Sequence, residues 1–237
     1  MQRFIIILLL TLVFFVSGCA SKAPWEQVDY DRQAEAYTNR GMGYLEQGET
    51  RQALQDFRKA LEVRTAYTEA LHGTAIALQQ QGDFSLAEGY FKQALQTKGN
   101  STAIRNNYAG FLFSQNRYDE AQKQLEGASK DIYYSDRILV FVNLGYVAIK
   151  LNQPEQAAGY FQQALALDSN FMVPHQALLA LHIKQKNWQQ AEQHWLFLRD
   201  AQINDEATLK QALIVVQNTG NQKEVRYITG LLTSSAN

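Results

Sequence analysis

A spacing of 34 residues repeats along most of this chain and constrains its fold more than any other feature. With Ala157 as the marker, successive equivalent residues are 34, 34, 36, 34 and 34 positions apart, namely Ala53, Ala87, Ala121, Ala157, Ala191 and Val225. Further columns keep the same register: the residue four after the marker is large and apolar in the first five copies, and the residue twelve before it is small in the first four. Several columns in one register indicate a true repeat.

Residues 138–171 illustrate the unit, which is predicted to form two helices joined by a turn. Apolar residues recur at spacings of three and four in both halves. Between the halves, Asn152 suits a left-handed helix end and Pro154 suits the first position of the next helix. Gly145 and Ala157 allow the two helices to approach closely. Such a hairpin cannot bury its apolar face alone, so its copies must stack.

A helix, turn and helix with this period resembles the tetratricopeptide repeat. We therefore predict an all-α fold, a right-handed superhelical solenoid of about six such repeats. The end repeats are atypical, as expected where one side faces solvent, because Leu179 and Leu213 replace the small residue at the helix crossing. The predicted repeat domain covers residues 34–237, divided as 34–67, 68–101, 102–135, 138–171, 172–205 and 206–237.

The first eighteen residues are predicted to be a signal peptide rather than part of the fold. A short positive region, Met1-Gln2-Arg3, is followed by a run that is apolar apart from Thr11, Phe4 to Val16, and that is short for a membrane span. The sequence VSGC at residues 16–19 resembles the bacterial lipobox, which implies that Cys19 carries a covalent lipid. Residues 19–33 are then a lipidated tether. An uncleaved anchor with an incidental thiol is the alternative interpretation.

Composition and motifs argue against several classes of function. The 22 basic and 23 acidic residues leave no basic excess for binding nucleic acid. The sequence contains no HExxH, Walker or GxSxG motif, so we expect no enzyme activity. His175 and His182 lie seven residues apart without a carboxylate partner, which makes a poor metal site. We expect no metal and no cofactor apart from the lipid on Cys19.

The resemblance to tetratricopeptide arrays implies a concave groove lined by the first helix of each repeat. Carried onto this sequence, the groove positions predicted to bind a partner are Thr38, Asn39, Met42, His72, Ile76, Asn106, Asn107, Phe113, Val142, Asn143, Tyr146 and Ile149. The asparagines either bind the backbone of a peptide or bond between repeats. The apolar residues favour an apolar or helical partner segment, unless they pack inside the array.

A lipobox followed directly by a six-unit array resembles the type IV pilus biogenesis and stability lipoproteins, the pilotins. The resemblance implies a monomeric lipoprotein on the periplasmic face of the outer membrane. Ala20 agrees with this location, because lipoproteins held in the inner membrane commonly carry Asp there. It further implies binding to secretin subunits, promotion of their localisation and multimerisation, and a role in pilus biogenesis and twitching motility. One alternative is another tetratricopeptide lipoprotein scaffold, serving barrel assembly or a peptidoglycan hydrolase. A second is an enzyme without a recognisable motif.

Overall fold

The computed structural model describes residues 29–97 and 101–234. The predicted signal peptide, Cys19 and most of the predicted tether lie outside these described residues. Within the described ranges the chain forms twelve α-helices, which pair as six helix–turn–helix hairpins. The predicted all-α fold of about six repeats is therefore confirmed. None of the helices in these ranges has the length and apolar character needed to cross a membrane.

The helices alternate regularly along the chain. The first three hairpins are α1 (Tyr30–Glu46) with α2 (Thr50–Val63), α3 (Thr68–Gln81) with α4 (Phe84–Thr97), and α5 (Thr102–Ser114) with α6 (Tyr118–Ser129). The last three are α7 (Arg137–Lys150) with α8 (Pro154–Leu167), α9 (Met172–Lys184) with α10 (Trp188–Asp200), and α11 (Glu206–Thr219) with α12 (Gln222–Ser234).

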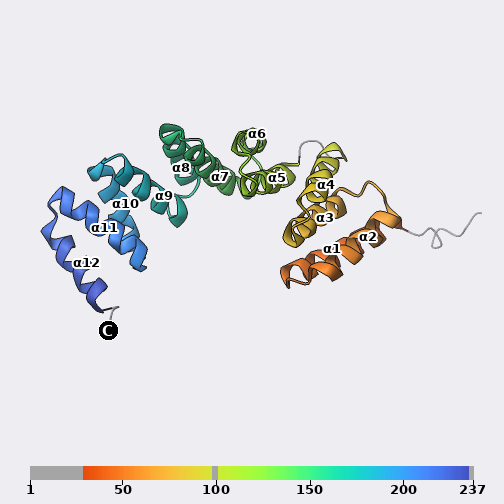
Figure 1. Ribbon diagram of the computed structural model, residues 1–237, viewed down its shortest axis with the longest axis horizontal. Coiled ribbons are helices and arrows are strands. Elements are labelled where there is room, and N and C mark those ends of the chain that lie inside the picture. The colour runs from red at the N-terminus through yellow and green to blue at the C-terminus, as the bar shows by residue number, and fades with distance from the viewer. Residues whose placement is uncertain (1–28, 98–100, 235–237) are drawn as a thin grey trace, which may run out of the picture.

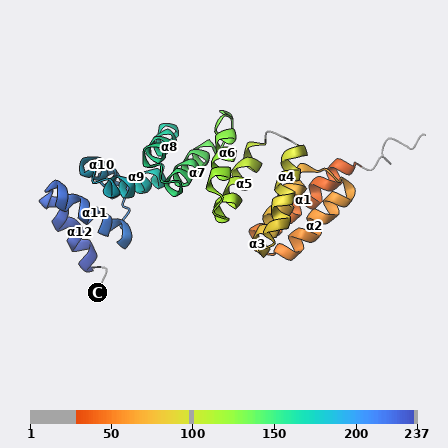
Figure 2. The same cartoon turned by 45° about the horizontal axis from the view of Figure 1, so that its top comes forward.

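The hairpins follow one another in chain order and together form an open arch (Figure 1). In the middle of the arch α5 and α7 lie on its inner side, and α6 and α8 lie on its outer side. Turning the molecule by 45° leaves the same succession of hairpins visible (Figure 2). The first helices of neighbouring repeats therefore face a common concave side, as a stack of repeats requires.

The turn inside each hairpin contains one residue with a positive φ. Five of these turns use glycine or asparagine, as the sequence predicts, with φ between 57° and 86°; these residues are Gly48, Gly82, Asn116, Asn152 and Gly220. In the fifth hairpin the position is held by Lys186, with φ of 58°. A lysine gains no local side-chain compensation in this conformation, so its backbone is held there by the packing of α9 on α10.

The first helix begins earlier than the sequence pattern indicates. Asp29 caps α1 by accepting a hydrogen bond from the Arg32 backbone N–H at 3.1 Å. This cap places residues 30–33, which were assigned to the tether, in the first turn of the helix. The irregular spacing after the third repeat is taken up by residues 130–136 ahead of α7, and Arg137, expected in that loop, is already helical.

Small residues at the helix crossings lie against aromatic rings. A β-carbon on Gly41 would lie 2.6 Å from Phe57 Cε1, and one on Gly145 would lie 2.5 Å from Phe161 Cε1. Gly73, which the repeat columns do not single out, approaches Phe57 equally closely from α3. The rings of Phe57 and Phe161 thus pack directly against the backbone of these glycines, so a larger residue at Gly41, Gly73 or Gly145 would require the ring to shift.

Helix α9 contributes to two hydrophobic cores. Leu178 packs in the core that extends from Leu71 to Leu181 through the middle repeats. The next residue, Leu179, packs with Trp195 in a separate core formed by α9 to α12. Leu179 and Trp195 are both fully buried. Leu179 is larger than the usual small residue at the crossing, and Trp195 is larger than the usual phenylalanine. The two therefore pack together within the last two hairpins.

Aromatic rings fill the contact between the second and third hairpins, where both views show α4 and α5 set well apart (Figures 1 and 2). The rings of Phe91 and Tyr108 are stacked with centroids 5.4 Å apart, and Phe111 lies 5.6 Å from Phe91. At the edge of this contact, Glu88 accepts hydrogen bonds from the Tyr108 hydroxyl at 3.0 Å and from Arg117 at 2.7 Å. The bond from Arg117 is the main reason that the pKa of Glu88 falls to about 2.

Candidate partner-binding groove

The first two repeats place few of the predicted groove residues on an open surface. Thr38 is buried, and its hydroxyl donates to the Ala34 carbonyl at 2.8 Å, so its prediction as a groove residue is wrong. Met42 and Ile76 are half-buried and pack beside Phe57, whereas Asn39 is exposed on α1. This part of the concave side is thus closed mainly by packing between helices.

Three of the predicted groove asparagines, Asn106, Asn107 and Asn143, form hydrogen bonds between repeats. Asn143 Nδ2 donates to Asn106 Oδ1 at 2.9 Å, joining α7 to α5. Asn107 Nδ2 lies 3.0 Å from His72 Nε2, joining α5 to α3. Because amide nitrogens only donate, His72 must accept with a neutral ring, and burial lowers its pKa to about 4. The four side chains therefore link three successive repeats.

Further along the concave side, three predicted residues converge on an apolar hollow. Phe113, Asn143 and Tyr146 line a cavity of about 250 Å³ between α5 and α7. Val142 was predicted to face the partner. It is instead buried and packs in the core of the middle repeats. Within this hollow, Asn143 is the polar residue besides the hydroxyl of Tyr146.

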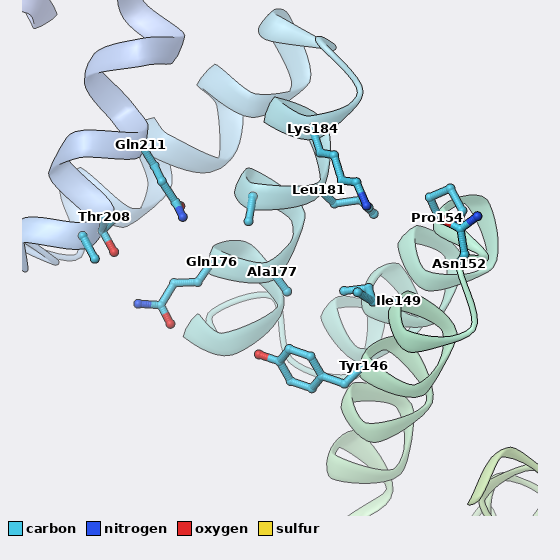
Figure 3. A pocket seen from close by; sticks show the side chains of 12 residues that line it. Tyr146, Ile149, Asn152, Pro154, Gln176, Ala177, Leu181, Lys184, Thr208 and Gln211 are labelled. Atoms are coloured by element: carbon cyan, nitrogen blue, oxygen red, sulfur yellow. The ribbon is translucent and has the colours of Figure 1, made fainter. Parts of the chain in front are cut away.

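A larger hollow of about 370 Å³ lies between α7, α9 and α11 (Figure 3). Tyr146 lines both hollows, so the two adjoin at this side chain, and together they are called the groove of repeats three to six. The predicted residue Ile149 lies on the floor of the larger hollow, and Tyr146 lies at one end with its ring edge against Phe161, centroids 5.4 Å apart. Burial raises the pKa of the Tyr146 hydroxyl, which therefore stays protonated and can donate a hydrogen bond.

Residues of the last two repeats that were not predicted complete this hollow. They come from α9 and α11 and comprise Gln176, Ala177, Ala180, Leu181, Lys184, Ala207, Thr208 and Gln211. Gln176, Ala177 and Ala180 hold the fifth, sixth and ninth positions of the fifth repeat, the same register that Thr38, Asn39 and Met42 hold in the first repeat. The repeat register therefore also places these three residues on the concave side. Lys184, at the thirteenth position, lies outside that register.

Three histidines gather between α9 and α10, away from the groove. His175 Nδ1 lies 2.9 Å from His194 Nδ1, and the His182 ring is stacked on His194 with centroids 5.7 Å apart. His175 Nε2 lies 3.0 Å from the Ser169 carbonyl, which requires that nitrogen to donate. His194 therefore donates to His175. Among the described residues no group of three or more potential ligands is arranged to hold a metal ion.

Comparisons with known proteins identify the repeats and their relatives. Family models described as tetratricopeptide repeat match residues 33–98, 78–132 and 138–171. The type IV pilus assembly protein PilF of Pseudomonas aeruginosa is 32% identical over 192 residues, covering 79% of this chain and 76% of PilF. Human tetratricopeptide repeat protein 6 is 30% identical over 170 residues, covering 56% of this chain and 32% of that protein.

Solved structures agree with these sequence matches. The structure of PilF from Pseudomonas aeruginosa superposes with a TM-score of 0.77 at 30% identity, covering 84% of this chain and 90% of PilF. The structure of PilW, described as a widely conserved type IV pilus biogenesis factor, has a TM-score of 0.73 at 22% identity and covers 85% of this chain and 92% of PilW. At that identity the match to PilW shows a common fold.

Proposed function

The chain belongs to the tetratricopeptide repeat family of the type IV pilus assembly protein PilF, and from this we propose that it is a pilotin: an outer-membrane lipoprotein that binds secretin subunits and promotes their localisation and multimerisation. Membership of this family makes the chain a binding scaffold and not an enzyme. The observation that carries the proposal is the agreement with PilF along most of both chains, in sequence and in fold.

The proposed binding surface is the groove of repeats three to six. Its walls are apolar, and its polar groups are mostly amides and a protonated tyrosine hydroxyl, which bind without reacting. A groove of this kind suits a segment of another protein that supplies its own apolar side chains. Held rigidly by the stacked repeats, it would bind a secretin subunit without first reorganising itself.

The proposed lipid on Cys19 would anchor the protein at the membrane. A protein with several acyl chains dissociates from a membrane very slowly, because each buried methylene contributes about 0.8 kcal/mol. Anchoring the array through a tether at the periplasmic face of the outer membrane would keep its groove near secretin subunits that must insert there. In this scheme the anchor and the groove act together, and neither requires a chemical reaction.

The proposal is tested by crosslinking the full chain in intact cells and identifying the crosslinked proteins. We expect secretin subunits to be recovered, and we expect cells lacking the protein to lose high-mass secretin multimers from their outer-membrane fraction on gradient centrifugation. Recovery of barrel-assembly proteins or a peptidoglycan hydrolase, with normal secretin multimers in the deletion strain, would contradict the proposal.

A further inference from the structure

We propose that the hollow between α7, α9 and α11 binds a partner segment in which a large apolar side chain lies close to the carboxylate of an aspartate or glutamate. This inference rests on the groove-binding function proposed above and adds the chemistry of the bound segment. It concerns the last three repeats. Of the residues that line this hollow, only those of α7 were predicted from the sequence.

The apolar part of the proposal follows from the shape and lining of the hollow. Its floor consists of Ile149, Ala177, Ala180 and Leu181, and its volume of about 370 Å³ is in the range of sites that enclose small organic groups. Ile149 is 36% exposed although it is a large aliphatic residue. A leucine or phenylalanine side chain placed there would remove this apolar surface from water, which favours binding.

The carboxylate part follows from the charges around that floor. Lys184 is the only charged side chain among the twelve lining residues. Figure 3 places it beside Leu181, at the end of the hollow opposite Tyr146. In the described part of the chain neither the Lys184 ammonium nor the Asn152 amide has a side-chain hydrogen bond or ion pair. The Lys184 ammonium on this rim is a positively charged donor without a partner, which complements a carboxylate.

The carboxylate is assigned to a side chain within the segment rather than to a chain terminus. Capture of a terminal carboxylate relies on several converging donors, often a nest of backbone N–H groups. Here one ammonium is available, and the second hollow adjoins this one at Tyr146. A bound segment can therefore run on through both hollows.

The test uses random twelve-residue peptides displayed on phage and selected on the full lipidated chain in lipid nanodiscs. We expect the selected peptides to share a large apolar residue within two positions of an acidic residue. Lys184→Gln should weaken their binding by roughly two- to fivefold, the effect of removing one partly exposed charge pair. Lys150→Gln is the matched control, because Lys150 also lies in the last turn of its helix, at the same register position, but does not line the hollow.

A second variant tests the apolar floor without disturbing the core. Ala180 lines the hollow and is exposed, so Ala180→Trp fills the space at little cost to folding, which circular dichroism verifies. We expect it to abolish binding of the selected peptides. Peptides that lack an acidic residue, or equal binding by the Lys184→Gln and Lys150→Gln variants, would overturn the inference. So would tight binding of a fluorescent fatty acid without any enriched peptide.

The same variants separate this inference from the proposed function. If the unmodified chain recovers secretin from cells but the selected peptides show no dependence on Lys184, the inference fails and the pilotin proposal stands. If the peptides depend on Lys184 while the unmodified chain recovers no secretin, the chemistry of the hollow is supported and the pilotin proposal fails.

Discussion

The ring of Phe161 lies directly against the α-carbon of Gly145, where a β-carbon would be only 2.5 Å from Phe161 Cε1. Phe161 is fully buried, so its ring cannot move aside freely. We expect Gly145→Ala to lower the free energy of unfolding by about 1–3 kcal/mol through overpacking, reduced by the better helix propensity of alanine. Thermal or urea unfolding measures the change.

Gly159 provides the matched control for that substitution. It lies in α8 of the same hairpin, and a β-carbon there would meet nothing within 4 Å. Gly159→Ala should raise the free energy of unfolding by about 0.5–1 kcal/mol, since only helix propensity changes. Equal effects of the two substitutions would show that the Gly145–Phe161 contact is not close.

Acid should destabilise the array through His194. Burial, and then the neighbouring His175 and His182, lower its pKa to about 4 from an ordinary value of 6.5. Between these two values the unfolded chain binds more protons than the folded chain, so stability falls as the pH falls. We expect the melting temperature to decrease from pH 6.5 towards pH 4, and the decrease to be smaller in His194→Gln. Parallel curves for the two proteins would contradict this.

Charge placed on the floor of the groove should prevent binding of an apolar partner segment. Ile149→Asp changes a partly exposed residue, so the fold should survive, but a bound segment would then bury an unpaired carboxylate. We expect secretin recovery to fall at least tenfold, measured by crosslinking of folded, lipidated protein. Leu167→Asp, an exposed leucine on the outer helix of the same hairpin, should bind normally. Loss of binding in both variants would direct attention to the outer surface.

Replacing Cys19 with serine should release the protein from the membrane. The lipobox resemblance makes Cys19 the site of lipid attachment, and none of the described helices is long and apolar enough to cross a membrane. We expect the variant in the soluble periplasmic fraction, without the mass of attached acyl chains. Sedimentation with outer membranes at the level of the unmodified chain would disprove the lipobox interpretation.

Most of the fold could be predicted because each residue type that recurs in the repeats is required there for one physical reason. Gly145 and Ala157 are small where helices cross, and Asn152 tolerates a positive φ where the hairpin turns. Local departures could not be predicted from these columns. Lys186 takes the left-handed conformation against its own preference, because the packing of α9 and α10 decides the turn.

The groove was harder to predict because register gives the face of a helix but not what covers it. Val142 and Thr38 hold groove positions and are nevertheless buried, since neighbouring helices close over them. Asn106 and Asn143 bond to each other, which only the spacing of adjacent repeats determines. The cation of Lys184 joins the hollow from a position that the register does not include.

Leu178 and Leu179, adjacent on α9, belong to different cores, and this divides the molecule into parts that can open separately. The core of the last hairpins can come apart while Leu178 still holds the middle repeats together. In a one-dimensional array such opening begins at an end, where a hairpin has one neighbour instead of two. Amide exchange should therefore be fastest in α12 and slow progressively towards α7. Fraying from that end would erase the α11 wall of the hollow first, so affinity for a partner would depend on how firmly the last hairpin is closed.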